Sequence, residues 1–172
     1  EDVPEDGWMT ASSGSLDLFV CADGPAGSGR YWNLTIGVAK KGENQPSRCV
    51  RLMTSTVGWR TLRQYKQGPL PWVDDLDRDG KAEVIIWDSF PLREAGSMAE
   101  YGLTAWVYRL TSGHSLAIDW VLSRRMAGEI AEAYRSPLDS ASPHLDPLRV
   151  RAAEALERFA DEQCSVPPDD TR

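Results

Sequence analysis

The amino-acid sequence predicts an α+β fold, in which an antiparallel β-sheet meander over residues 15–120 precedes two C-terminal α-helices at about residues 121–135 and 147–163. Two observations support this prediction. Apolar residues alternate with a period of two through much of the chain, and apolar residues spaced four apart begin only near residue 120. Strands first and helices last lack the strand and helix alternation that a parallel, doubly wound sheet requires.

Loops rich in glycine and proline separate the predicted strands. The first of these strands cover residues 16–21, 32–38, 49–53 and 59–65. A central strand is predicted at residues 83–87, because the four consecutive apolar residues from Val84 to Trp87 suit burial on both faces of a sheet. Two more strands are predicted at residues 103–110 and 116–120.

The two helices are predicted from spacing and from their ends. The first carries a row of apolar residues four positions apart and ends before Pro137; the row is Leu122, Met126, Ile130 and Tyr134. The second begins with Asp146 as N-cap and Pro147 at the first helical position. Its apolar stripe is Leu148, Ala152, Ala155, Leu156 and Phe159.

Length and composition predict one α+β domain over residues 15–172, preceded by an extended N-terminal arm over residues 1–14. A chain of 172 residues with 41% hydrophobic residues can form one sizeable core but is short for two domains with a linker. The arm is rich in Pro, Gly, Ser and acidic residues, with Trp8 and Met9 as its apolar anchors.

Charge and hydropathy argue against two classes of partner. Acidic residues outnumber basic ones by 26 to 19, which gives a formal net charge of −7 and makes nucleic acids and anionic membranes poor partners. No apolar run approaches the ~18 residues of a membrane span, so none is predicted. The oligomeric state is not predictable from these features.

The most informative segment is the acidic run at residues 74–83, which leads directly into the predicted central strand. Counted from Asp75, carboxylates fall at positions 1, 3, 5 and 9, and Gly80 is at position 6, where a tight loop needs a positive φ. This spacing predicts a loop that binds Ca²⁺. The alternative is an acidic turn whose side chains extend into water. An EF-hand is excluded, because its position 12 would be Ile86, which cannot donate a carboxylate.

The pattern Asp-x-Asp-x-Asp-Gly-x-x-Glu followed by Val-Ile-Ile, within residues 73–87, resembles the FG-GAP/VCBS class of calcium loops, which occur in integrin-like propellers and many secreted bacterial proteins. The resemblance implies a structural Ca²⁺ ion with five protein ligands: the side chains of Asp75, Asp77, Asp79 and Glu83 and the backbone carbonyl of Lys81. The loop occurs once in the chain, whereas a whole propeller would show repeated copies.

These features lead us to expect an exported protein, secreted or periplasmic with its signal peptide removed, that serves as a non-enzymatic scaffold or binding module for a protein or a glycan. Weak calcium loops are useful where calcium is abundant, outside the cell. The sequence contains no Gly-x-Ser-x-Gly nucleophile elbow, and its two histidines, His114 and His144, lie in turn-like sequence. Most of the seven tryptophans are expected in the core, while Trp59 and Trp72 border loops and are the better candidates for an exposed face that could stack on a glycan.

Two alternatives remain open at this point. One is a secreted hydrolase or lyase with an acidic site near residues 74–94, in which Asp88 or Glu94 acts as acid or base. The other is an inhibitor of a secreted enzyme, with a protruding loop at residues 23–30 or 41–47.

The three cysteines allow one disulfide in three pairings, or none. Cys21 and Cys49 both lie in the strand-rich half, which favours their pairing over a pairing with Cys164. A strand between the two would prevent it, since bridged Cα atoms lie within about 7 Å.

Overall fold

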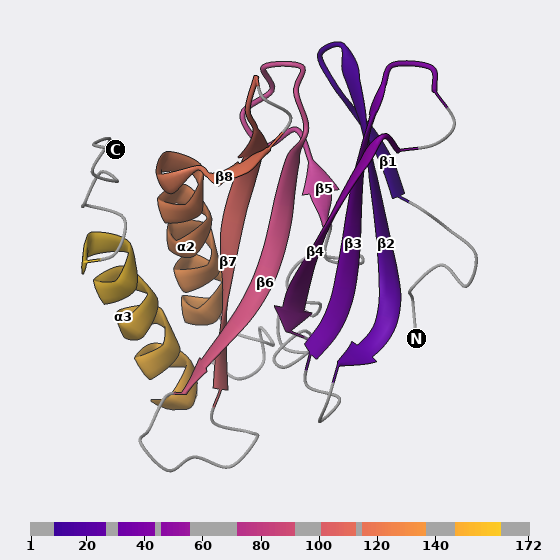
Figure 1. Cartoon of the computed structure of the whole chain (residues 1–172). Coiled ribbons are helices and arrows are strands. Elements are labelled where there is room, and N and C mark those ends of the chain that lie inside the picture. The colour runs from indigo at the N-terminus through magenta and orange to yellow at the C-terminus, as the bar shows by residue number, and fades with distance from the viewer. Residues whose placement is uncertain are drawn as a thin grey trace, which may run out of the picture. The chain divides into compact units, whose positions relative to one another are not determined.

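The computed structural model confirms the α+β class and describes residues 9–26, 31–43, 46–55, 72–91, 101–112, 115–136 and 147–162 (Figure 1). Strands precede helices along the chain, as predicted. In chain order the elements are β1 (Met9–Ser13), β2 (Leu16–Ala26), β3 (Tyr31–Lys40), β4 (Arg48–Ser55), β5 (Val73–Asp74), β6 (Glu83–Pro91), β7 (Tyr101–Leu110), β8 (Leu116–Ile118), α2 (Trp120–Arg135) and α3 (Pro147–Glu162).

The strands form two four-stranded sheets with the orders β1-β2-β3-β4 and β5-β6-β7-β8. Each sheet is a meander in chain order, but the predicted meander is divided between two sheets instead of continuing through one. The division falls between β4 and β5, which are both edge strands. A period-two pattern identifies each strand without specifying its neighbour, so the sequence pattern does not locate this division.

The end of the predicted N-terminal arm belongs to the first sheet. Residues 9–13 form β1 and pair antiparallel with β2, from Met9 opposite Val20 to Ser13 opposite Leu16. The turn between them contains Gly14 at φ 62°. The sequence of this strand, Met-Thr-Ala-Ser-Ser, shows no clear alternation of apolar residues, so the sequence pattern did not predict it. Its pairing with β2 is what identifies it as a strand. Residues 1–8 lie outside the described part of the chain.

Contacts between Cα atoms divide the chain into two compact units. The first contains Glu1–Thr56, Pro71–Trp87 and Val107–Ile118; the second contains Val57–Leu70, Asp88–Trp106 and Asp119–Arg172. The first unit therefore holds the whole acidic loop, and the second holds both helices. The prediction of one domain over residues 15–172 stays a prediction.

In the first unit, the core is built from alternate residues of the strands. Leu18, Val20, Leu34 and Ile36 are fully buried, and Val20 lies opposite Ile36 across β2 and β3. In β6, every residue from Val84 to Trp87 is buried, which confirms the prediction of a central strand covered on both faces.

A buried hydroxyl links the two sheets within the first unit. Thr54 of β4 is fully buried, and its Oγ1 donates to the Trp87 carbonyl (3.2 Å) and accepts from the Trp87 N–H (3.1 Å). One side chain thus satisfies both backbone groups of Trp87, a residue of the second sheet.

In the second unit, the predicted apolar row of α2 is buried as expected; its members are Leu122, Met126, Ile130 and Tyr134. Asp119 caps the helix by accepting from the Leu122 N–H (2.9 Å). The Tyr134 hydroxyl accepts a hydrogen bond from the Leu103 N–H of β7 (3.0 Å), which joins the helix to the sheet.

The two helices lie side by side (Figure 1). Pro147 begins α3 as predicted, whereas the predicted N-cap Asp146 is outside the described residues. Arg149 of α3 is buried and donates to the carbonyls of Ala133, Tyr134 and Ser136 at 2.6–2.9 Å, so it satisfies the C-terminal end of α2. Neither α2 nor α3 has the length and apolar character that crossing a membrane requires.

The favoured disulfide between Cys21 and Cys49 is wrong. Strand β3 lies between them: Cys21 of β2 is opposite Thr35, and Cys49 of β4 is opposite Gly37 on the same strand. No disulfide joins Cys21 to Cys49. Cys164 lies outside the described residues.

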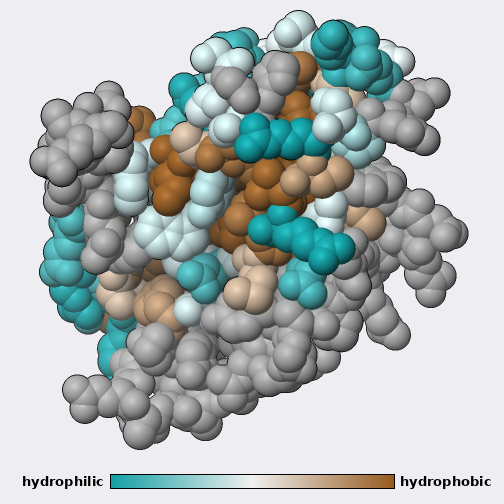
Figure 2. Space-filling model, viewed as in Figure 1, coloured by the Kyte–Doolittle hydropathy of each residue, from teal (hydrophilic) through white to brown (hydrophobic). Residues whose placement is uncertain are grey.

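Hydrophobic and hydrophilic residues are interspersed on the face seen in Figure 2. Among the described residues, the exposed large hydrophobic side chains are Met53 (60% exposed) on β4 and Val121 (78%) on α2. Single exposed apolar side chains are normal on a protein surface, so neither indicates a docking site.

Candidate metal centre

The acidic loop connects the antiparallel strands β5 and β6. Asp74 is opposite Glu83 in the register, so the two ends of the loop, Asp75 and Glu83, are brought close together. Gly80 has the positive φ (83°) that the sequence predicts for it. Arg78 also has a positive φ (63°), which the sequence did not indicate and which is uncommon for a residue other than glycine.

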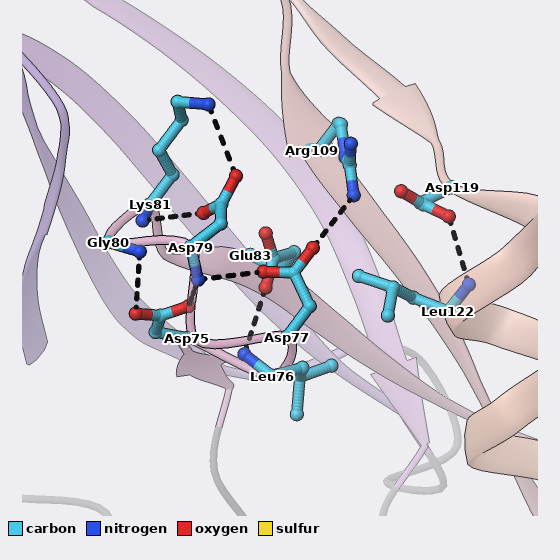
Figure 3. Close-up of polar contacts among 10 residues, drawn as sticks. All are labelled: Asp75, Leu76, Asp77, Asp79, Gly80, Lys81, Glu83, Arg109, Asp119 and Leu122. Atoms are coloured by element: carbon cyan, nitrogen blue, oxygen red, sulfur yellow. Dashed lines mark hydrogen bonds and ion pairs between the residues drawn. The ribbon is translucent and has the colours of Figure 1, made fainter.

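Three of the predicted ligands meet in this loop. Asp75, Asp77 and Glu83 each place one carboxylate oxygen within 4.8 Å of the others (Figure 3). Asp75 is half-buried, Asp77 is exposed and Glu83 is buried. Three carboxylates at this separation repel one another, and the group can hold a metal ion, which would relieve that repulsion.

Backbone N–H groups of the loop hold the aspartates in place. The Asp79 N–H donates to Oδ1 of Asp75 and to Oδ1 of Asp77, both at 3.1 Å. The Gly80 N–H donates to Oδ2 of Asp75 at 3.0 Å (Figure 3). Backbone N–H groups of the loop thus orient the carboxylates of Asp75 and Asp77.

Glu83 is the buried member of the cluster, with 1% of its surface exposed. Its Oε2 accepts from the Leu76 N–H (3.0 Å), and within the described part of the chain no basic side chain forms an ion pair with it. Desolvation raises the pKa of Glu83; the nearby charges of Asp77 and Asp79 add to this effect, while the Leu76 hydrogen bond and Arg109 oppose it.

Asp79 faces a different partner from the other loop carboxylates. Its Oδ1 accepts from the Lys81 N–H (2.8 Å), and its Oδ2 pairs with the Lys81 ammonium (3.1 Å), so it is not a member of the three-carboxylate cluster. The hydrogen bond from the Lys81 side chain is the main reason why the pKa of Asp79 is lowered. The roles of Asp79 and of the Lys81 carbonyl as ligands stay predictions. Asp74 accepts from the Asp75 N–H (2.9 Å), apart from the cluster, and was not predicted as a ligand.

Arg109 is a member of the site that the sequence did not indicate. It lies near the end of β7, and its guanidinium donates to Oδ2 of Asp77 at 3.3 Å (Figure 3). Arg109 is 26 or more positions from every predicted ligand, and the order β5-β6-β7 brings it to the loop. A single arginine in an alternating strand carries no signal for such a contact.

A cavity of about 340 Å³ adjoins the loop. Its walls come from the turn between β1 and β2, from loop residues 79 and 81–83, and from the end of β7 with the residues that follow it. Asp79, Lys81, Glu83 and Arg109 all line it. All of these residues belong to the first unit.

The remaining candidate residues lie outside the acidic cluster or outside the described part of the chain. Trp72 is buried, at 5% exposure, so the prediction that it is exposed is wrong: it begins the segment that leads into β5. Asp88 accepts from the Ser89 N–H (2.8 Å) and from Nε1 of Trp106 (3.4 Å). Outside the described residues lie the candidates Trp59, Glu94, His114 and His144, together with parts of the loops at 23–30 and 41–47.

Comparisons of the chain with protein-family models, with curated proteins and with solved structures gave no match. The arrangement of the loop therefore carries the functional argument.

Proposed function

We propose that the loop at residues 75–83 binds one Ca²⁺ ion with a structural role, as the resemblance to FG-GAP/VCBS loops implies. The side chains of Asp75, Asp77, Asp79 and Glu83 and the carbonyl of Lys81 would hold it. The observation that carries this proposal is the buried carboxylate of Glu83 beside two further carboxylates. Burying a charge without a counter-charge is costly, and a cation in the cluster would remove that cost.

The donor atoms favour calcium over other ions. Every proposed ligand atom is an oxygen, which suits a hard cation, whereas zinc and copper sites in proteins usually include nitrogen or sulfur ligands. Ca²⁺ tolerates irregular geometry, whereas Mg²⁺ requires a near-ideal octahedron and keeps several waters. A loop of aspartates with irregular geometry is therefore suited to Ca²⁺.

Asp79 must exchange its partner for the proposed set to form. Its contact with the Lys81 ammonium lies at the surface, where both side chains are substantially exposed. Surface ion pairs contribute little to stability, because water screens them. A divalent cation is therefore expected to attract this carboxylate away from Lys81.

The location of the loop supports a structural role. It joins β5 to β6, and beside Glu83 the Ala82 N–H donates to the Ser12 carbonyl of β1 (3.2 Å). An isolated bridge between Ser13 and Lys81 adds to this connection. An ion in the loop would thus hold a segment that contacts β1 and leads directly into β6. We propose that the protein is an exported scaffold or binding module that uses this ion for rigidity and not for catalysis.

A second candidate function is a hydrolase or lyase, and one observation favours it. Glu83 lines the cavity and has a raised pKa, which is a property of general acids. We prefer the calcium site because the carboxylate of Glu83 lies in a cluster with two other carboxylates, and a cation would relieve the repulsion among them.

Calorimetric titration of chelator-treated protein with Ca²⁺ tests the proposal. We expect saturation at one site with a dissociation constant of roughly 10⁻⁴–10⁻³ M or lower, as in extracellular calcium modules. Asp77→Asn should weaken binding at least about tenfold, the effect of losing ~1.4 kcal/mol. Asp74→Asn is the matched control and should bind as the unchanged protein does.

Absence of saturable heat up to several millimolar Ca²⁺, on the scale of the weakest modules, would refute the calcium site. Equal weakening by Asp77→Asn and Asp74→Asn would show that general loss of negative charge, and not this ligand set, explains the binding.

A further inference from the structure

The proposed ligand set leaves the coordination of calcium incomplete if each carboxylate binds through one oxygen. It then offers five oxygens, whereas Ca²⁺ takes about six to eight. The position at which an EF-hand supplies a bidentate carboxylate is held here by Ile86, which is buried in β6. An ion in this loop would therefore accept additional oxygens from water or from a ligand.

The cavity lies where such a ligand could approach. Glu83 belongs to the acidic cluster and also lines the cavity, so the two sites share a side chain. Lys81 and Arg109 supply positive charge to the cavity wall, and Ser13 and Thr111 supply hydroxyl groups. A volume of about 340 Å³ suits a ligand the size of one sugar ring or one amino acid.

The charge of the site depends on the ion. Without calcium, the four carboxylates Asp75, Asp77, Asp79 and Glu83 face the two cations Lys81 and Arg109, a balance of −2 that repels anions. A bound Ca²⁺ would bring this balance to zero. It would also attract Asp77 away from Arg109 and Asp79 away from Lys81, the ion pairs that engage these cations at 3.3 and 3.1 Å.

We propose that this cavity binds a small hydroxylated carboxylate, of the acidic-sugar class, when calcium occupies the loop. A ligand oxygen would complete the coordination of the ion, Lys81 and Arg109 would pair with the carboxylate, and the hydroxyl groups of the wall would bond to those of the sugar. This inference rests on the proposed calcium site. By linkage, the ligand and calcium must strengthen each other's binding by the same factor.

The test is a calorimetric titration of the full chain with galacturonate, first in Ca²⁺ in excess over the sugar and then in chelator. We expect saturable binding in calcium and at least about tenfold weaker binding in chelator, a coupling of ~1.4 kcal/mol. Galactose, which lacks the carboxylate, should bind at least about tenfold more weakly than galacturonate by the same measure.

Variants separate the cavity from the ion. Lys81→Gln keeps the backbone carbonyl, so both it and Arg109→Gln should still bind Ca²⁺, and each should weaken galacturonate binding about tenfold or more. Arg109→Gln should bind Ca²⁺ more tightly than the unchanged protein, because a cation beside Asp77 is gone. Arg125→Gln, a matched loss of charge in α2, should alter neither titration.

Normal calcium binding with no galacturonate binding, or with equal binding in chelator, would overturn this inference and leave the calcium site intact. Tighter binding of N-acetylaspartate than of galacturonate would overturn the assignment to an acidic sugar. Failure of calcium itself to bind would instead refute the proposed function.

Discussion

Glu83 shows most clearly how one residue sets the chemistry of the loop. The sequence places it one residue before a run of apolar residues, and in the structure it is as buried as that run. Desolvation raises its pKa above the ordinary value of 4.5. Because the native state then holds the proton more tightly than the unfolded state does, the protein loses stability as the pH rises from 4.5 through the raised pKa. A bound cation would reverse this, since it stabilises the ionised form.

The variant Glu83→Gln tests that description. In metal-free buffer at pH 7, its melting temperature should exceed that of the unchanged protein, because the neutral amide avoids the desolvation that raises the pKa of Glu83. The difference should vanish as the pH falls below 4.5, where Glu83 is protonated in both states. In saturating Ca²⁺ the unchanged protein should have the higher melting temperature, because the variant lacks one of the proposed ligands. Thermal melts across pH 4–7.5 measure both effects. If the variant is less stable than the unchanged protein at every pH without metal, burial of the ionised Glu83 carboxylate does not destabilise the fold.

Single residues also show what sequence could and could not predict. Asp75, Asp77 and Glu83 were predicted from carboxylate spacing and come together, because loop positions close in sequence are close in space. Arg109 was missed, because its contact depends on which strands are neighbours. The interaction of Asp79 with Lys81 was also missed: a residue two positions away competes for a carboxylate that the pattern assigns to the ion.

At the scale of elements, helices were predicted more accurately than sheets. The row from Leu122 to Tyr134 marks α2 by its spacing alone, and Pro147 marks the start of α3, because helix bonds and caps are local. Strand β1 and the division of the strands into two sheets depend on pairing between distant segments, which alternation does not encode. The same limitation led to the wrong pairing of Cys21 with Cys49.

The contact between β4 and β6 gives a prediction at this scale. Thr54→Val removes the hydroxyl that bonds both the N–H and the carbonyl of Trp87, so it should lower the free energy of unfolding by about 1–3 kcal/mol. Thr104→Val is the matched control, because Thr104 is also buried but its hydroxyl has no hydrogen-bond partner within the described structure; its change should stay within about 0.5 kcal/mol or stabilise. Urea unfolding measures both. Equal losses would mean that removing the hydroxyl matters less than changing the shape of the side chain.

At the scale of the whole molecule, the order of strands and helices along the chain predicted the α+β class, which the structure confirms. The described structure places the acidic loop in the unit that contains the first sheet. The loop contacts Ser12 and Ser13 of β1 and leads directly into β6, so we expect calcium to stabilise more of this unit than the loop itself.

The most direct test is the melting temperature of the protein in chelator and in saturating Ca²⁺, compared with that of Asp77→Asn. An ion at one hundred times its dissociation constant adds ~2.7 kcal/mol, so the melting temperature should rise by roughly 5–10 °C in the unchanged protein and by far less in the variant. No rise in the unchanged protein, or the same rise in Asp77→Asn, would contradict the claim that this loop is a calcium-stabilised part of the fold.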